Sequence, residues 1–595
     1  MQSPMNTVGH PPQVVNGARP ARGRGQPTKQ TPARVRSLNR ALVEAAVKDH
    51  ALPADGELAR QVGLSERTVR AIRLNTLGLD RREVKDWQAQ ARGARASRSS
   101  TARELICATP FAGLWLLVPQ LIDTGLAQAA ERLRTGWSRH TRVRPVDIVL
   151  TLVAWAALGF RRLMHVDDFR HWADMGLALF TGHWHLWSDT TLWRWVHGVT
   201  QKSAAAFYQA TAAWTAAQPG SQGRFSLDEH VVPSFTTLKP RRLGKTRVPS
   251  RGRAYPAFRL YLPFDLDLGR FVGLLVRKAR ETLSQTALAL IVELRRLRRL
   301  AGVPNPDQVR LILDRGGYKG SLFAALLADP GISFIAMARA TAVNVRQWEA
   351  LPAHRFRPYY PAGEDNPHLQ IARTTTTIRG CPLPVPSVVI RDDTPKTKQR
   401  WRVLFYKNAP GQHPHAATID AEYRQRQEHE QSFAQLVHAL AGHGLPKAYA
   451  MVREPNAQGQ RRTTVSTAET SLSQQAVHLV AWVKALTFNL IRDFGAALGR
   501  EQAHWQVGTL ARRYLIRPGR LYLQAGALVV QLDPFRGAEA LEAFLRQLNA
   551  RQLAIPWLFG LALRVEIAPQ PLGLAATPHL LGHKILAYAG AASPP

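Results

Sequence analysis

Apolar residues recur along the chain with periods that change from region to region, and each period predicts a kind of structure. From Phe111 to about Ala217 they return every three or four positions among many tryptophans, which predicts an all-helical domain at residues 107–219 with the tryptophans in its core. From Ser221 the pattern shortens to strand-like runs such as "RFSLDEH" and "QVRLILDRGG", separated by the helical run "SQTALALIVELRRLRRLAG". This alternation predicts a mixed α/β core.

The α/β pattern is interrupted once. Residues 331–408 contain short strand candidates, among them "LQIARTTTTI", "SVVIRDD" and "RWRVLFY", and little helical periodicity. Helical patterns return at residues 419–438 and 475–498. We therefore predict a β-rich insertion at 341–412 that divides the core into residues 220–340 and 413–501.

The two ends of the chain have their own patterns. Residues 1–37 are rich in Pro, Gly and Arg without apolar periodicity, which predicts a disordered basic arm. Residues 91–106 are small and basic, which is typical of a linker. In the tail, "RLYLQAGALVVQL" predicts a hairpin that turns at Ala525 and Gly526, and a helix follows at residues 538–549. Residues 502–595 then form a small α+β region, and the whole chain is a multidomain α+β protein.

Between the arm and the linker, residues 38–90 contain the run "LARQVGLSERTVRAIR". Its apolar positions suit two short helices, with Gly63 at the turn and Ser65 as the cap of the second. This spacing is typical of a helix-turn-helix, in which Arg67, Thr68 and Arg70 would meet DNA. The alternative is an ordinary pair of packed helices.

Charge narrows the class of partner. The chain has 79 Lys and Arg against 42 Asp and Glu, a net charge of +37, which favours a nucleic acid. A Gly/Pro-containing segment soon after residue 228 is especially basic and predicts a loop that contacts DNA phosphates, with a merely solvated loop as the alternative. The residues that we expect to bind there are Lys239, Arg241, Arg242, Lys245 and Arg247. The arginines at 295, 296, 298 and 299 end a helix and need no DNA role.

Two cysteines, Cys107 and Cys381, exclude a disulfide framework and a cysteine-rich zinc module. The N-terminus does not resemble a signal peptide, and the most apolar run, residues 148–160, is too short to cross a bilayer. We expect a soluble intracellular protein that does not bind a membrane.

Three carboxylates are candidates for chemistry. Asp228 ends "FSLD" and Asp314 ends "LILD", where buried strands emerge toward solvent. In "EYRQRQEHEQSF", one helical face carries Tyr423, Arg426 and Glu430, and Glu428 points about 200° away from Glu430. Each aspartate alone is more simply explained as a solvated strand cap. Together, the three acids suit two hard cations, Mg²⁺ or Mn²⁺, in phosphodiester chemistry.

The same residues resemble the catalytic core of DDE transposases of bacterial insertion sequences, in the branch with a β-rich insertion before the glutamate. "SLDEHVVP" and "LILDRGGYKG" resemble the two aspartate strands, with one glycine more than usual before Tyr318. Tyr423, Arg426 and Glu430 fit the family spacing Y-x-x-R-x-x-x-E. The family often has a lysine further along this helix, where this chain has Val437; His438 or Lys447 are candidates to replace it.

The resemblance implies a ribonuclease H-like core in which Asp228, Asp314 and Glu430 hold about two Mg²⁺ or Mn²⁺ ions. It implies hydrolysis at the ends of a DNA element and joining of the freed 3′-hydroxyl to target DNA, by a homodimer on paired ends. Tyr423 and Arg426 would contact DNA. The cell compartment would be a bacterial cytoplasm, at the nucleoid. A DNA-binding regulator, a catalytically inactive relative, and a nuclease of the same fold without strand transfer remain as alternatives.

Overall fold

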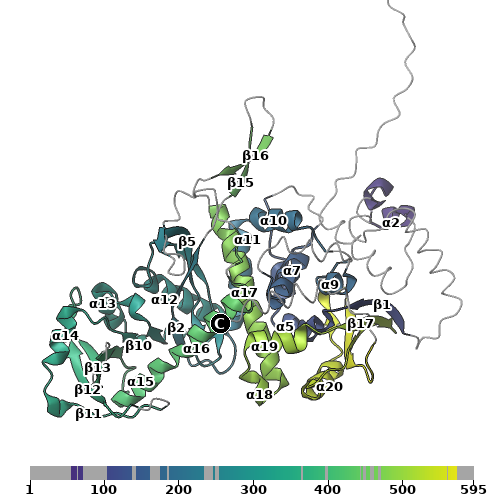
Figure 1. Ribbon diagram of the computed structural model, residues 1–595. Helices are drawn as coiled ribbons and strands as arrows, with labels where there is room; N and C mark the ends of the chain where they lie inside the picture. Colours follow the sequence, from purple (N-terminus) through teal and green to yellow (C-terminus); the bar gives the residue numbers. More distant parts are fainter. Residues whose placement is uncertain are drawn as a thin grey trace, which may run out of the picture.

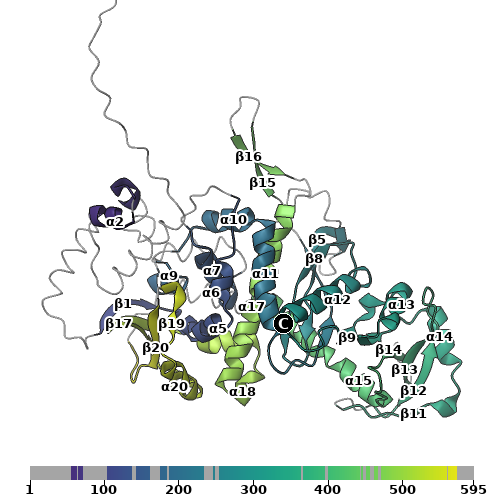
Figure 2. The ribbon, with the colours of Figure 1, turned by 180° about the vertical axis from the view of Figure 1, so that it is seen from behind.

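A computed structural model of the chain shows a mixed α/β protein with several sheets and many helices, in which one long helix, α17 (Ser471–Leu498), runs between two halves (Figures 1 and 2). On one side lies a large sheet and on the other a group of helices with a smaller sheet. The structure describes residues 55–62, 64–70, 103–136, 143–160, 174–183, 186–233, 245–247, 254–362, 366–394, 400–442, 444–446, 450–455, 461–466, 471–558 and 560–572.

The centre of the large sheet is made of five strands. β2 (Arg224–Leu227) pairs in parallel with β9 (Val309–Leu313) and antiparallel with β6 (Phe264–Asp265). β10 (Ile332–Met337) is parallel to β9, and β7 (Arg270–Phe271) is antiparallel to β6. The order β7-β6-β2-β9-β10 therefore joins an antiparallel side to a parallel side at β2.

Both faces of this sheet are covered, which is why β9 ends in three successive buried apolar residues, 311–313. Leu311 and Leu313 pack with α12 (Leu283–Leu300) and α13 (Gly320–Ala328) in one hydrophobic cluster. Ile312 points the other way, into the cluster that contains α17.

The strands that we predicted as a separate insertion extend this same sheet. β14 (Trp401–Lys407) pairs antiparallel with β10, and β13 (Val385–Asp392), β12 (Leu369–Thr376) and β11 (Arg357–Pro358) follow outward. The predicted strands are present, and they continue the sheet of the core because β14 pairs with β10. The bounds of the insertion stay a prediction. The helix α14 (Ala342–Glu349) packs on these strands, where its Trp348 donates a hydrogen bond to Thr376 at 3.2 Å.

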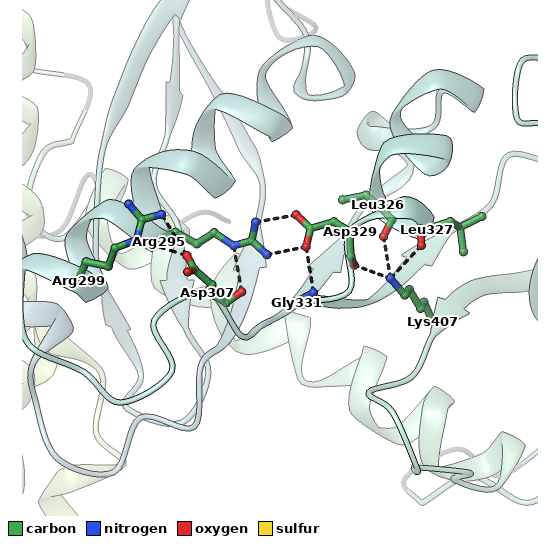
Figure 3. Close-up of polar contacts among 8 residues, drawn as sticks. All are labelled: Arg295, Arg299, Asp307, Leu326, Leu327, Asp329, Gly331 and Lys407. Carbon is green, nitrogen blue, oxygen red and sulfur yellow. Dashed lines mark hydrogen bonds and ion pairs between the residues drawn. The ribbon is translucent and has the colours of Figure 1, made fainter.

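A polar network joins the core helices to the outer strands (Figure 3). Arg295 on α12 forms a bidentate ion pair with Asp329, at 2.6 and 2.9 Å. Lys407, at the end of β14, donates to the carbonyls of Leu326, Leu327 and Asp329, so that it caps the end of α13. Arg295 is thus occupied by a structural contact, and three further arginines of α12 also have protein partners: Arg296 pairs with Glu293, Arg299 with Asp307, and Arg298 bonds to the Pro306 carbonyl.

Two smaller sheets flank the core. β3 (Glu229–Pro233), β5 (Ala254–Tyr261) and β8 (Leu275–Lys278) form an antiparallel group that also pairs with β4 (Lys245–Arg247). Later in the chain, β15 (Ala450–Pro455) and β16 (Arg461–Ser466) pair antiparallel in a two-stranded sheet that stands out from the body in both views (Figures 1 and 2).

The tryptophan-rich region is helical, and α17 packs against it. Trp482 of α17 donates a hydrogen bond to Thr211 of α11 (Gln201–Ala216) at 2.7 Å. Trp115, Trp155 and Trp195 are buried. The helices are η1 (Ala112–Leu117), α5 (Val118–Asp123), α6 (Leu126–Ala130), α7 (Pro145–Ala157), α9 (Met175–Phe180) and α10 (Asp189–Gly198).

The helical region does not begin as predicted. β1 (Glu104–Thr109) is a strand, and it pairs antiparallel with β17 (Gly519–Gln524) of the C-terminal sheet. The boundaries of 91–106 as a linker and 107–219 as all-helical were therefore wrong at this point. The pairing crosses more than 400 positions, and residue periodicity carries no signal for it. The C-terminal sheet has the order β1-β17-β18-β20-β19.

The predicted C-terminal hairpin is present. β17 and β18 (Ala527–Leu532) are joined by Ala525 and Gly526, whose φ angles of 48° and 77° suit a tight two-residue turn. β20 (Leu561–Ile567) and β19 (Ala554–Ile555) complete the sheet, and α20 (Glu542–Ala550) packs on it. The short elements α18 (Arg500–Ala503), α19 (Val507–Leu510) and η5 (Ala511–Leu515) connect α17 to this sheet.

At the N-terminal side, α2 (Asp55–Val62) is followed by a second helical segment at residues 66–70. Ser65 caps it by accepting a hydrogen bond from the amide of Thr68 at 3.2 Å. Ala59, Leu64 and Val69 are buried between the two helices. The predicted disordered arm, residues 1–37, lies outside the described residues. No helix in the described part of the chain is long and apolar enough to cross a membrane.

Candidate active site

Asp228 and Asp314 leave the central sheet side by side. Leu227 on β2 and Leu313 on β9 are register partners in a parallel pair, so the next residue on each strand emerges at the same edge. Both aspartates are partly exposed there, at 21% for Asp228 and 34% for Asp314. The carboxyl end of parallel strands is where ligand sites of open α/β sheets lie.

Helix α16 (Arg426–His438) brings the third acid to the same edge. Its inner face is fixed by His429, which is fully buried, stacks on Phe264 with ring centroids 5.1 Å apart, and forms a hydrogen bond with Ser226 of β2 at 2.9 Å. With His429 turned inward, its neighbour Glu430 points to the edge of the sheet. The sequence pattern did not identify His429 or Ser226, although a histidine three residues after Arg426 on the helix was a visible signal.

One guanidinium contacts all three acids. Arg426 lies 2.9 Å from the carboxylate of Asp228 and 3.5 Å from that of Asp314, and it also pairs with Glu430 one turn further along α16. Arg426 itself is 9% exposed, whereas the side chain of Glu430 is 51% exposed. The structure therefore brings Asp228, Asp314 and Glu430 together around a single buried positive charge.

The backbone that carries Arg426 is anchored to the same two strands. α15 (Ala416–Arg424) ends immediately before α16, with Gln425 as the joint between them. Arg310 of β9 forms a bidentate ion pair with Glu422, and Arg224 of β2 donates to the side chain of Gln425 at 2.9 Å. These contacts hold the joint on the strands from which the two aspartates emerge.

Burial and mutual repulsion change the acidity of this cluster. Burial raises the pKa of Asp228 to about 6; Arg426 opposes this rise, and the charges of Asp314 and Glu430 add to it. Burial likewise raises the pKa of Tyr423 to about 12. Perturbed groups of this kind concentrate at functional sites, although structural ion pairs also produce them.

A fourth carboxylate, Glu229, directly follows Asp228 but is committed to structure. It pairs with Arg259, accepts a hydrogen bond from Tyr261 at 3.2 Å, and accepts another from the amide of Leu283 at 2.8 Å. The last contact caps the first turn of α12, where a negative charge is favourable. Glu229 is therefore not available to join the three acids.

The three acids fit a hard divalent cation by their chemistry. Carboxylate oxygens are the ligands that Mg²⁺ and Mn²⁺ prefer. Among the residues that the structure describes, however, no three His, Cys, Asp or Glu side chains are arranged so that they could hold a metal ion together. Arg426, in contact with each of the three acids, accounts for their present arrangement.

Comparisons with known proteins do not assign the chain to a family. No protein-family model and no curated protein matches the chain. Seven chains of solved structures match it. One is the piggyBac transposase in a cryo-EM structure of its synaptic complex with hairpin DNA, with a TM-score of 0.34 and 10% sequence identity over 70% of this chain and 82% of that chain. A likeness of this size carries no conclusion about the chemistry of the site.

The residues predicted to contact DNA lie in several places. Tyr423 is buried beside Arg426, so both are turned into the acid cluster rather than to the surface. In the N-terminal helices Arg67 is exposed, Thr68 is half-buried, and Arg70 is paired with Asp55 at 3.2 Å. Their role in DNA binding stays a prediction.

Of the basic segment, only two of the five residues can be described. Lys245 and Arg247 lie on β4, and the side chain of Lys245 is exposed. The segment is therefore partly a strand rather than wholly a loop. Lys239, Arg241 and Arg242 lie outside the described residues.

The backbone does not require either of the two glycines that follow Asp314. Gly317 is buried against Leu313 and Leu283, so a nucleic-acid backbone has no access to it. Neither Gly316 nor Gly317 has a positive φ angle, and an added Cβ atom would make ordinary contacts at 3.6 Å or more. The requirement for glycine lies instead at Gly320, where a Cβ atom would come within 2.1 Å of the Arg379 carbonyl. On α16, Val437, which stands where the family often has a lysine, is half-buried, and His438 is exposed.

Proposed function

We propose that this chain is a DDE-type transposase, which hydrolyses DNA phosphodiesters at the ends of an element and joins the freed 3′-hydroxyl to target DNA. The observation that carries the proposal is the convergence of Asp228, Asp314 and Glu430 on the single guanidinium of Arg426. These acids come from two strands and a helix that are far apart in the sequence. An ordinary strand cap does not require such a meeting.

The topology of the central sheet supports the proposal. Numbered along the chain, its five strands β2, β6, β7, β9 and β10 have the order 3-2-1-4-5, with the fourth and fifth parallel to the first. This is the strand order of the ribonuclease H-like core that the resemblance implies. The two aspartates follow its first and fourth strands.

Each acid has a role in the proposed chemistry. Asp228, the most buried of the three, would hold Mg²⁺ or Mn²⁺ together with Asp314 and Glu430. Bound there, such ions lower the pKa of an attacking water or hydroxyl and stabilise the leaving oxygen. In this proposal Glu430, which is half exposed at the edge, would also accept a proton from an incoming nucleophile.

A polyanionic substrate agrees with the charge of the chain. A net charge of +37 favours DNA, and the affinity should fall steeply with salt. The N-terminal helix pair is the proposed reader of the element ends. A homodimer acting on two paired ends in a bacterial cytoplasm is part of the same proposal.

The experiment is a cleavage and joining assay with Mg²⁺ and DNA that bears the native flanking inverted repeats. We expect Asp228→Asn, Asp314→Asn and Glu430→Gln each to lower both products at least about 100-fold. Glu428→Gln is the matched control, because Glu428 lies on the same helix but faces Arg492 at 3.5 Å.

The products separate the alternatives. Cleavage without joining would identify a nuclease of the same fold. DNA binding with equal, background cleavage by wild type and all variants would identify a DNA-binding regulator or an inactive relative, and would contradict the catalytic proposal.

A further inference from the structure

The acid cluster has its own positive partner. Arg426 uses one terminal nitrogen for Asp228, at 2.9 Å, and the other for Asp314, at 3.5 Å, and for Glu430. Its side chain is 11% exposed, so the pairing is largely shielded from water. In a partly buried site such contacts are much stronger than on a surface.

We propose that Arg426 is an internal counter-ion, which holds the three acids together before a divalent cation binds and is displaced from them when one binds. The inference rests on the proposed function, because it concerns the same three acids. It explains how three mutually repelling carboxylates stay gathered at one edge of the sheet.

The exchange is favourable in one direction and costly in the other. A divalent cation carries twice the charge of a guanidinium and approaches carboxylate oxygens to about 2.1 Å. It therefore outcompetes the arginine, but only after the three contacts of Arg426 are lost. The wild-type site should consequently bind a divalent cation more weakly than the three acids alone could.

The local structure allows this exchange without a movement of the backbone. In the proposed exchange the side chains of Arg426, the first residue of α16, and of Glu430, which is half exposed on the same helix, move away from each other. Glu422 and Gln425 stay fixed to β9 and β2. A released guanidinium can pair with a DNA phosphate, which it binds bidentately. The predicted contact of Arg426 with DNA would then follow cation binding.

The test measures Mn²⁺ binding to the full chain by titration calorimetry, without DNA. Arg426→Gln removes the positive charge and keeps a similar length; we expect it to bind Mn²⁺ at least about tenfold more tightly than wild type. Arg426→Lys retains the positive charge, so its affinity for Mn²⁺ should rise less than that of Arg426→Gln. Arg299→Gln is the control for loss of an arginine, because Arg299 forms an exposed pair with Asp307. Adding Asp228→Asn to Arg426→Gln should abolish the gain.

Thermal unfolding gives a second measurement that requires no activity. Without metal, Arg426→Gln should unfold at a lower temperature than wild type and Arg299→Gln, and Mn²⁺ should restore more of its stability than that of wild type. If wild type binds Mn²⁺ and Arg426→Gln binds it equally or more weakly, the counter-ion inference is wrong while the proposed function stands. If neither protein binds Mn²⁺, the metal-dependent function is wrong, and the inference with it.

Discussion

Leu227 and Leu313 are register partners on the parallel strands β2 and β9, and this pairing alone makes Asp228 and Asp314 neighbours. Their adjacency is a property of the backbone and does not depend on a contact between the two carboxylates. A slip of one residue between the strands would turn one aspartate to the opposite face of the sheet. Because both leucines are fully buried, the register is firmly specified.

The ionised carboxylate of Asp228 should make the folded protein less stable than a neutral side chain at this position would. Burial raises the pKa of Asp228 from 3.8 to about 6, so its ionised form is disfavoured in the folded protein. Stability is therefore lowered above pH about 6, and the loss is relieved as the pH falls toward 3.8. We expect Asp228→Asn to raise the free energy of unfolding at neutral pH, without divalent cations, by up to about 3 kcal/mol.

Urea unfolding followed by tryptophan fluorescence measures this effect. The gain should disappear below pH about 4, where the wild-type carboxyl is protonated too. Glu428→Gln, on the exposed side of α16, should show no gain at any pH. A variant Asp228→Asn that is less stable than wild type at neutral pH would mean that Arg426 more than offsets the cost of burying the charge.

Two buried histidines should make the fold sensitive to acid. Burial lowers the pKa of His429 from 6.5 to about 3 and that of His478 from 6.5 to about 4. Both are neutral in the folded protein and take up a proton on unfolding. Stability is thus fully present above pH 6.5 and falls below it, by about 1.4 kcal/mol per pH unit for each histidine.

The variant His478→Gln tests this prediction, because glutamine can still donate to the carbonyl of Leu274, which His478 contacts at 3.3 Å. Between pH about 6 and about 4 its free energy of unfolding should decline less steeply than that of wild type, because one proton fewer is taken up on unfolding. Parallel curves for the two proteins would show that His478 does not titrate on unfolding.

The cap that Lys407 places on α13 should contribute measurably to stability. Its ammonium group donates to three carbonyls, of Leu326, Leu327 and Asp329, at 3.2, 3.0 and 2.5 Å (Figure 3). Lys407→Met keeps the aliphatic stem but leaves these acceptors without their donor, and should cost about 1–3 kcal/mol. Arg299→Gln, which breaks an exposed pair in the same figure, should cause no measurable change. Similar losses from both variants would show that the cap has no special role.

What the sequence could predict depends on how local the cause is. The turn at Ala525 and Gly526 follows from two adjacent residues, and the strands around it from alternation, so both were predicted. The spacing of Arg426 and Glu430 shows that they share a helical face. The contact of Arg426 with Asp228, 198 positions away, depends on how α16 docks on β2 through His429 and Ser226. Docking is decided by packing that no single segment contains.

The same reason explains two strand pairings that the sequence did not predict. In the sequence, α14 and three strands lie between β10 and β14. The pattern of "RWRVLFY" predicts that β14 is a strand, but it does not indicate which strand β14 pairs with. β1 is short and pairs with β17, at the far end of the chain. Non-local partners of this kind cannot be read from periodicity.

The last prediction concerns the contact that joins the helical region to the C-terminal part. At Gly113 of η1, a Cβ atom would lie 2.1 Å from the carbonyl oxygen of Tyr514 and 2.7 Å from that of Leu515, both in η5. These are backbone atoms, which cannot turn away as a side chain could. The amide of Gly113 also donates a hydrogen bond to the backbone carbonyl of Arg517 at 3.1 Å, so the two segments are held close.

Gly113→Ala should therefore force η1 and η5 apart and lower the free energy of unfolding by about 2–3 kcal/mol or more. Gly136→Ala is the matched control, because Gly136 is exposed and its nearest neighbour would be 3.9 Å from the new Cβ atom. Since Asp228, Asp314 and Glu430 lie on the other side of α17, DNA cleavage at a temperature where both variants are folded should be unchanged. Equal melting temperatures for the two variants would show that η1 and η5 do not depend on this close approach, whereas lost cleavage by folded Gly113→Ala would show that α17 transmits the packing of one half to the acids of the other.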